Sequence, residues 1–268
     1  MGNRSVRETT KGEGSITAYR LLALDMDGTL LTDDKKITEE TRRWIRLAEE
    51  AGVKVIFATG RGMQTAGSFW DELGLQSPMV LLNGAEIWEG PGRLHERVYL
   101  GREDIRRLHG LAVDAGASYW GYSVESLTNN RHWNEDMFNR DWMKFGISHK
   151  DLAVIRKLRE EVRSWGHLEI TRSADINMEI SLSGISKASG VQKVCKLLGI
   201  TMDQVMAVGD HHNDLQLLLS AGLGIAMGNA DEDVKLAADG VTDTNERNGV
   251  AKAIQKYLFQ TDPAQFAG

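Results

Sequence analysis

The chain has a single cysteine among its 268 residues, Cys195, which excludes an internal disulfide framework. Val191, Val194 and Leu198 give Cys195 the spacing of a buried helical stripe, so we expect a core residue rather than a reactive thiol. No apolar run approaches the ~20 residues of a membrane span. The N-terminus also lacks the apolar segment of a secretory signal, so we expect a cytoplasmic protein.

An excess of positive charge is missing as well, because the formal net charge is -6. A protein that binds nucleic acid or an acidic membrane surface without sequence preference needs a basic face, so we expect neither partner. The hydrophobic content of 41% is ample for a packed core, and the length predicts about two domains. Residues 1–18 are polar and lack periodicity, and we expect a disordered leader there.

Alternating apolar segments predict a doubly wound α/β fold. A first strand ends at Asp25, further strands are expected at 53–58 and 79–82, and the helix after the first strand is capped by Thr38 and ends at Gly52. This order predicts a parallel sheet with crossover helices. The same alternation returns late in the chain, with strands at 205–208 and 224–227 and helices at 187–198, from 214, from 231 and up to 259. The two ends of the chain therefore predict one domain.

Residues 84–184 differ in sequence pattern from the two ends of the chain and are numerous enough for an inserted domain. The expected strands lie at 93–100, 118–128, 144–148 and 168–182, and the expected helices at 104–115 and 152–165. We expect an α+β insertion with one antiparallel sheet and helices on one face. The predicted division is a core at 19–83 and 185–268 and an insertion at 84–184.

Two aspartates, Asp25 and Asp27, follow the first strand directly. Side chains two residues apart in a strand lean to the same face, and Gly28 then lets the backbone turn sharply. Two carboxylates about 4 Å apart repel by roughly 4 kcal/mol at an effective dielectric near 20, so a cation or a shared proton must compensate them. The pattern predicts a metal-assisted catalytic pair.

Polar residues also follow two further strands. In a parallel open sheet, ligands bind beyond the carboxyl ends of the strands. Thr59 and Gly60 follow the second strand, where glycine lets a backbone N–H approach an anion such as phosphate. Asp210, Asn213 and Asp214 follow the strand at 205–208. Taken singly, Thr59 also fits a turn and Asp214 a helix N-cap.

Two kinds of cation could balance the charge of these acidic groups. Lys187, at a predicted helix start, could balance an anionic substrate, although it also fits a surface lysine. Four aspartates at two neighbouring strand exits concentrate charge, which a divalent cation would compensate. Oxygen ligands alone favour magnesium, which often bridges to a phosphate.

With these residues in place, the chain closely resembles the haloacid dehalogenase superfamily, and within it the Cof-type phosphatases with a large α/β cap. The motifs that carry the resemblance are Asp25-Met26-Asp27, Thr59-Gly60-Arg61, Lys187, and Asp210 with Asn213 and Asp214. The first and last are the specific ones, and the resemblance spans residues 20–257. Ala188 stands where the family usually has glycine, which leaves the ammonium of Lys187 in place. Only about thirty residues separate the first two motifs, so the cap must follow the second.

The resemblance implies a Rossmann-like core and a phosphatase that works through an aspartyl-phosphate on Asp25, with Asp27 as acid and then base. It implies Mg²⁺ held by Asp25, the backbone carbonyl of Asp27, Asp210 and Asp214. It also implies phosphate-binding residues at Met26, Thr59, Gly60, Lys187 and Asn213. His211 and His212 fill the open motif positions, and we expect them to face solvent or the cap rather than the metal.

Other functions use related sequences. A phosphotransferase such as a hexose-phosphate mutase uses the same core, with a sugar instead of water as acceptor. A receiver-like module accepts phosphate without turnover, but it needs neither the insertion nor Asp27. A dinucleotide-dependent oxidoreductase needs Gly-x-Gly-x-x-Gly after the first strand, where this chain has Asp-x-Asp-Gly.

The sequence says less about the substrate. We expect a small phosphorylated metabolite, with sugar phosphates ahead of pyridoxal phosphate or flavin precursors. Aromatic residues between 119 and 145 could stack on a ring, but we expect most of them to form the core of the cap. They are Tyr119, Trp120, Tyr122, Trp133, Phe138, Trp142 and Phe145.

Overall fold

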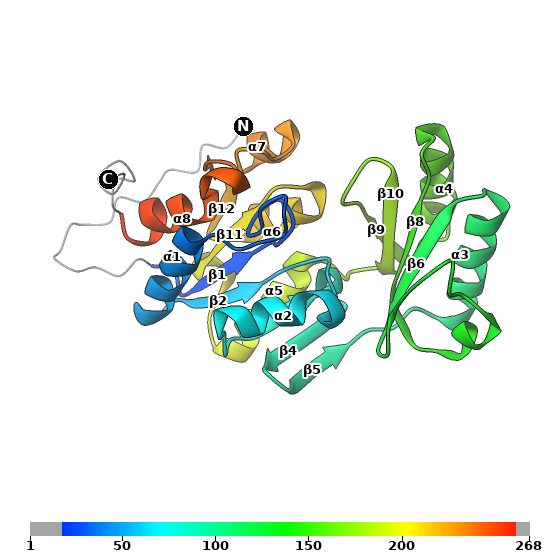
Figure 1. The fold of residues 1–268 in the computed structure, drawn as a ribbon, viewed down its shortest axis with the longest axis horizontal. Helices are drawn as coiled ribbons and strands as arrows, with labels where there is room; N and C mark the ends of the chain where they lie inside the picture. The colour runs from blue at the N-terminus through cyan, green and yellow to red at the C-terminus, as the bar shows by residue number, and fades with distance from the viewer. Residues whose placement is uncertain (1–17, 261–268) are drawn as a thin grey trace.

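The computed structural model describes residues 18–260, which form two parts side by side (Figure 1). The larger part contains a five-stranded sheet in the order β13-β12-β11-β1-β2. Its strands are β1 (Leu21–Leu24), β2 (Lys54–Phe57), β11 (Val205–Gly209), β12 (Leu223–Ala226) and β13 (Gly240–Val241). Every pair in it is parallel, which confirms the doubly wound core. The leader expected at the N-terminus lies almost entirely outside the described residues.

The helices of this part precede or follow the parallel strands along the chain. They are α1 (Glu39–Glu50), α2 (Met63–Leu73), α5 (Lys187–Leu198), α6 (Leu215–Ser220), α7 (Glu232–Ala237) and α8 (Gly249–Ala253), which continues into a π-helical turn at Ile254–Leu258. The predicted cap of α1 is confirmed, since the side chain of Thr38 accepts a hydrogen bond from the N–H of Thr41. Cys195 on α5 is buried, as expected. No helix within residues 18–260 is long and apolar enough to cross a membrane.

A second sheet begins where we expected the insertion. Strands β3 (Met79–Leu81), β4 (Glu86–Gly90) and β5 (Arg93–Arg97) pair antiparallel, and a bridge from Ala58 to Val80 ties β3 to the parallel sheet. β4 therefore pairs with a core strand and β5 pairs with β4, and neither belongs to the sheet of the insertion. The domain boundary predicted at residue 84 stays a prediction. From the strand pairing, we propose that the boundary falls after β5.

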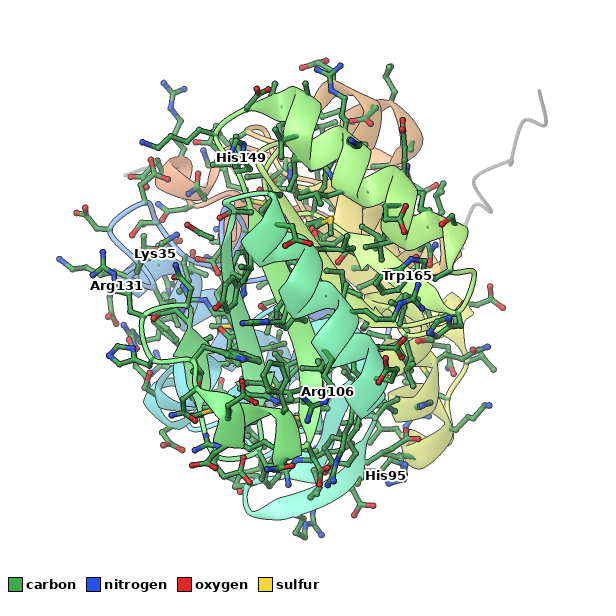
Figure 2. All side chains as sticks on the ribbon, turned by 90° about the vertical axis from the view of Figure 1, so that its right-hand side faces the viewer. Lys35, His95, Arg106, Arg131, His149 and Trp165 are labelled. Carbon is green, nitrogen blue, oxygen red and sulfur yellow. The ribbon has the colours of Figure 1, made fainter. Side chains whose placement is uncertain are left out.

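The smaller part, the cap, holds an antiparallel sheet in the order β7-β6-β8-β10-β9. Its elements are β6 (Ser118–Ser123), β7 (Leu127–Asn129), β8 (Trp142–Ser148), β9 (Leu168–Thr171), β10 (Asn177–Leu182), α3 (Arg102–Asp114) and α4 (Leu152–Ser164). The two helices lie across the face of this sheet that is turned away from the core (Figure 2). One antiparallel sheet with helices on one face agrees with the expectation, although the segments at 118–128 and 168–182 each form two strands.

Most of the aromatic residues of the cap belong to its hydrophobic core. The residues packed in this cluster are Tyr119, Trp133, Phe138, Trp142 and Phe145. Trp120 and Tyr122 lie outside the cluster and line a cavity between the cap and the core. These two are therefore the aromatic residues that remain available to a ligand.

Candidate active site

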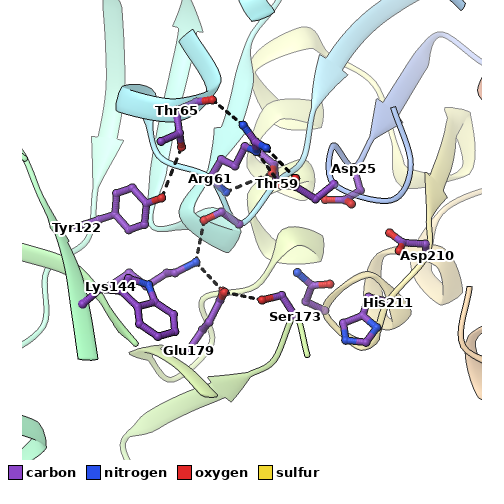
Figure 3. Close-up of a pocket in the computed structure, with 14 residues that line it drawn as sticks. Asp25, Thr59, Arg61, Thr65, Tyr122, Lys144, Ser173, Glu179, Asp210 and His211 are labelled. Carbon is purple, nitrogen blue, oxygen red and sulfur yellow. Dashed lines mark hydrogen bonds and ion pairs between the residues drawn. The ribbon is translucent and has the colours of Figure 1, made fainter. Parts of the chain in front are cut away.

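The polar residues at the strand exits meet in a cavity of about 600 Å³ between the core and the cap (Figure 3). β1 pairs with β2 on one side and with β11 on the other. Asp25, Thr59 and Asp210 follow the carboxyl ends of these strands and all line the cavity. The structure therefore brings together residues that are up to 185 positions apart in the chain, because parallel strands end at one edge of a sheet.

Three carboxylates form a compact group at this edge. Asp25, Asp210 and Asp214 each place one oxygen within 4.8 Å of the others. Burial raises the pKa of Asp25 well above its ordinary value against the effect of Lys187. Burial and the charge of Asp214 raise the pKa of Asp210 to about 6. A group of this kind favours a nearby cation, and its oxygen-only donors fit a hard divalent ion such as Mg²⁺.

Gly28 keeps the space that Asp210 occupies. Its φ of +79° is in the left-handed region, and a Cβ at this position would lie 2.3 Å from Asp210 Oδ2. The hydroxyl of Thr29 donates to the other oxygen, Oδ1, at 2.9 Å. The turn after β1 therefore positions the carboxylate contributed by β11, so the two motifs form one structural unit.

Lys187 balances part of the negative charge of this group. It is buried at the start of α5, and its Nζ lies 2.5 Å from Asp25 Oδ1 and 2.7 Å from Asp214 Oδ1. The second oxygen of Asp214 accepts the N–H groups of Asp210 and His211. Both oxygens of Asp214 thus have partners, which makes it a support for the group, whereas Asp25 and Asp210 both line the cavity.

Asp27 has a different environment, since its carboxylate lies outside the group just described. Arg61 donates to both of its oxygens at 2.6 and 2.7 Å, and Lys35 donates at 2.8 Å. Partial burial would raise the pKa of Asp27, but the hydrogen bonds from Arg61 and Lys35 lower it to about 2. The carboxylate is therefore ionised in this arrangement, which is the state of a base.

The residues expected to bind phosphate lie around the same edge. Thr59 is buried, and its hydroxyl accepts the N–H of Arg61 at 3.2 Å. Asn213 donates from its amide to Asn83 at 3.4 Å. The side chain of Met26 is fully buried, so only its backbone can reach a ligand. These positions agree with a phosphate loop, and their role stays a prediction.

The two histidines lie beside acidic residues of the α7 region. His211 Nδ1 is 2.7 Å from Asp231, and His212 Nε2 is 3.0 Å from Asp233. Neither belongs to the group formed by Asp25, Asp210 and Asp214. His211 also lines the cavity. The role of these side chains stays a prediction.

The sequence analysis missed a polar cluster that the cap contributes to the cavity. Lys144 on β8 and Glu179 on β10 form a buried ion pair at 2.5 Å, and Lys144 also donates to the carbonyl oxygen of Gly60 at 2.7 Å. Glu179 accepts further hydrogen bonds from Ser173 at 3.0 Å and Asn83 at 3.1 Å. Burial alone would raise the pKa of Glu179, but Lys144 and these hydrogen bonds lower it.

Signals for these missed residues exist in the sequence. Lys144 and Glu179 are charged residues inside otherwise apolar strand segments, and a buried charge needs a partner. Asn83 follows the third strand of the core, β3, just as the catalytic candidates follow the others. Its φ of 56° and that of Leu82, 51°, place two non-glycine residues in the left-handed region, a form of strain that is typical of functional sites.

Comparison with known proteins adds the identity of the relatives. The family model described as haloacid dehalogenase-like hydrolase matches residues 22–254. The 5-amino-6-(5-phospho-D-ribitylamino)uracil phosphatase YcsE of Bacillus subtilis (strain 168) is 40% identical, over 90% of this chain and 96% of the relative. The pyridoxal phosphate phosphatase YbhA of Escherichia coli (strain K12) is 27% identical, over 90% and 99%. A solved haloacid dehalogenase-like hydrolase from Bacteroides thetaiotaomicron has a TM-score of 0.76 at 27% identity, over 89% of this chain and 99% of the other.

Proposed function

Because the chain belongs to the haloacid dehalogenase-like hydrolases and is a phosphatase of that family, we propose that it hydrolyses small phosphorylated metabolites with Mg²⁺ and an aspartyl-phosphate on Asp25. The observation that carries this proposal is the buried group of Asp25, Asp210 and Asp214 beside Lys187. A candidate nucleophile, a candidate metal site and a fixed ammonium thus lie next to one another. A cytoplasmic location is part of the proposal.

The residues that would hold the metal are Asp25, the backbone carbonyl of Asp27 and Asp210. Asp214 would support them through its hydrogen bonds to the loop. When bound, Mg²⁺ would supply the positive charge that reduces repulsion between the anionic nucleophile and the anionic phosphate.

The side chains carry out the proton and phosphoryl transfers. Asp25 attacks phosphorus, the bond to the ester oxygen breaks, and Asp27 gives that oxygen a proton. Asp27 then takes a proton from the water that attacks the aspartyl-phosphate, and inorganic phosphate leaves. Because Arg61 and Lys35 hold Asp27 ionised in the structure, Asp27 must leave these partners and take a proton from solvent before the first step. Lys187 would balance charge on the phosphoryl oxygens.

The phosphate-binding set would surround the phosphoryl group from the carboxyl ends of β1, β2 and β11. The remaining members of this set are the backbone of Met26, the hydroxyl of Thr59, the N–H of Gly60 and the amide of Asn213. Each of them can donate or orient a hydrogen bond toward charge that redistributes during transfer.

The relatives suggest where to look for the substrate. YcsE and a second relative, YitU, 31% identical, are both 5-amino-6-(5-phospho-D-ribitylamino)uracil phosphatases. We therefore take that compound as the first candidate and pyridoxal phosphate as the second. This order places a flavin precursor ahead of the simple sugar phosphates that the sequence analysis favoured.

The test is phosphate release from a panel of metabolite phosphates, with Mg²⁺ or with a chelator. We expect turnover by the wild type with Mg²⁺ and loss of turnover in Asp25→Asn. Asp34→Asn, an exposed aspartate nearby in sequence, is the matched control and should behave as the wild type. Absence of turnover on every phosphate would refute the proposal, and transfer to a sugar instead of release would indicate a phosphotransferase.

A further inference from the structure

We propose that Trp120 is a stacking platform for a flat polar ring in the leaving group of the substrate, with Glu179, Lys144 and Ser173 along the edge of that ring. The inference rests on the proposed function, because it concerns the part of the substrate that the phosphate leaves behind. The register of the cap sheet and one glycine in that sheet support the proposal.

Trp120, Gly146 and Glu179 occupy one row across three neighbouring strands. Trp120 on β6 pairs with Gly146 on β8, and Gly146 pairs with Glu179 on β10. Residues of such a row point to the same face of the sheet. Here that face is turned toward the core, since both Trp120 and Glu179 line the cavity of the candidate active site.

The missing side chain of Gly146 lets the indole lie flat on the sheet. A Cβ at Gly146 would lie 2.1, 2.3 and 2.7 Å from the adjacent Trp120 ring atoms Cε2, Cζ2 and Cδ2. An atom that close to three neighbouring ring atoms meets the face of the ring rather than its edge. One face of the indole therefore covers the backbone of β8. Trp120 is only half-buried, and its exposed surface belongs to the cavity.

The indole also packs against a small hydrophobic cluster that includes Tyr122. Tyr122, two residues along β6, lines the cavity next to Trp120, and its ring lies 5.6 Å from Lys144 Nζ. Tyr119 points to the opposite face of the sheet from Trp120 and Tyr122 and packs in the core of the cap. The platform is thus built into a rigid sheet rather than into a loop, which favours a fixed orientation of the ligand.

The neighbours of the indole determine what kind of ring fits. Beyond Gly146, the same row carries the carboxylate of Glu179, which accepts hydrogen bonds, and Lys144 and Ser173 adjoin it (Figure 3). A carboxylate, an ammonium and a hydroxyl in contact offer both acceptors and donors. These groups already bond to one another, but a ring edge with its own donors and acceptors can use the lone pairs and N–H that these bonds leave over, which a purely apolar edge cannot. The chemistry thus favours a nitrogen heterocycle that carries N–H donors and carbonyl acceptors.

The size of the cavity allows one ligand to reach both places. Asp25 and Trp120 line the same cavity of about 600 Å³, which is in the range of small-molecule sites. A phosphate at Asp25 and a ring on Trp120 require a linker between them. A phosphorylated ring compound with a flexible polyol chain meets this requirement, whereas a short sugar phosphate leaves the platform uncovered.

The experiment compares kcat/KM for two substrates, one of which lacks the ring and the nitrogen that links it to the chain. They are 5-amino-6-(5-phospho-D-ribitylamino)uracil and ribitol 5-phosphate, which is its phosphorylated chain. We expect Trp120→Leu to lower the ratio of the two kcat/KM values about tenfold, through KM, because aromatic stacking is lost. Trp120→Phe keeps a flat face and should restore most of the ratio. Gly146→Ala should lower it as Trp120→Leu does, because the methyl group displaces the indole.

The control variant is Trp165→Leu, which removes a tryptophan of the cap that does not line the cavity. It should leave the ratio unchanged. If Trp120→Leu lowers kcat/KM equally for both substrates, its role is structural and the proposal is overturned. The proposal also fails if Trp120→Leu leaves the ratio at its wild-type value.

Calorimetric titration with the dephosphorylated ring compound tests stacking without turnover. We expect the wild type to bind it about tenfold more tightly than Trp120→Leu does. If no phosphate is hydrolysed, the proposed function fails, and the titration still decides whether the ring stacks. If ribitol 5-phosphate is hydrolysed while the ring compound binds equally to both proteins, the stacking is wrong and the phosphatase function stands.

Discussion

Replacing Lys187 by methionine tests how the buried carboxylates of the site are held together. The substitution keeps an unbranched side chain that is one atom shorter and removes the ammonium that contacts Asp25 and Asp214. Their carboxylate oxygens lie within 4.8 Å, and two unit charges at this separation repel by about 3.5 kcal/mol at an effective dielectric of about 20. Removing one partner of a buried ion pair costs about 3–5 kcal/mol in other proteins.

We therefore expect Lys187→Met to lower the free energy of unfolding by about 3–5 kcal/mol in the presence of a chelator. This loss corresponds to a decrease of roughly 6–20 °C in Tm. Urea unfolding, followed by circular dichroism, measures the loss in free energy of unfolding. Adding Asp214→Asn to Lys187→Met should recover part of the loss, since one of the two repelling charges is then removed.

The matched control is Lys193→Met on the same helix, α5. The Lys193 ammonium lies 2.5 Å from Glu96, the same distance as in the pair of Lys187 with Asp25, but its side chain is 32% exposed. A solvent-exposed pair contributes about 0–1 kcal/mol, so the control should unfold close to the wild type. Equal losses in the two variants would refute the reasoning, because burial would then make no difference.

Three further predictions concern other parts of the molecule. Gly28→Ala places a methyl group 2.3 Å from Asp210 Oδ2 at a φ of +79°, so phosphate release should fall at least about tenfold and need more Mg²⁺; an unchanged Mg²⁺ titration would contradict this. Burial raises the pKa of Cys195 to about 11, so an aromatic disulfide reagent at about pH 8 should label the protein in urea and leave the native protein unlabelled; fast labelling of the native protein would show that the thiol is accessible. The lowered pKa of Glu179 contributes stability above the unfolded value of about 4.3, and this contribution is lost as the pH falls below it. Glu179→Gln should therefore lose less stability than the wild type between about pH 5 and pH 3 in urea unfolding, and parallel curves would argue against an ionised Glu179.

The core of the candidate site was predictable because it depends on local signals. Asp25, Thr59 and Asp210 each follow an apolar strand segment, and the ends of parallel strands share one edge whatever the order of the strands. The strand order itself required the structure. The contact between Asp27 and Arg61 also could not be predicted from the sequence, because it depends on how two loops turn.

The boundary proposed for the insertion depends on a turn that the sequence marks only in part. The chain reverses after β3 through Leu82, Asn83 and Gly84, all with positive φ. Asn83-Gly84 is a dipeptide typical of such turns, whereas leucine rarely adopts this conformation. The N–H groups of Leu82 and Asn83 donate to the carbonyl oxygens of Arg61 and Thr59, so the phosphate loop stabilises the turn. A contact between two distant segments thus returns β4 and β5 to the core.

The residues of the cap that face the cavity follow from strand register. Tyr119 and Trp120 are adjacent, so one must point to each face of the sheet, and a slip of one residue would exchange them. Composition does not decide between the two aromatic rings. The charged residues do, because Lys144 and Glu179 cannot remain within the apolar layer under α3 and α4 and must face the cavity. Gly146 shares that face with Lys144 because it lies two residues along the same strand, and its partner Trp120 must then face the cavity too. Polar residues inside buried strands therefore indicate which aromatic side chains reach a ligand.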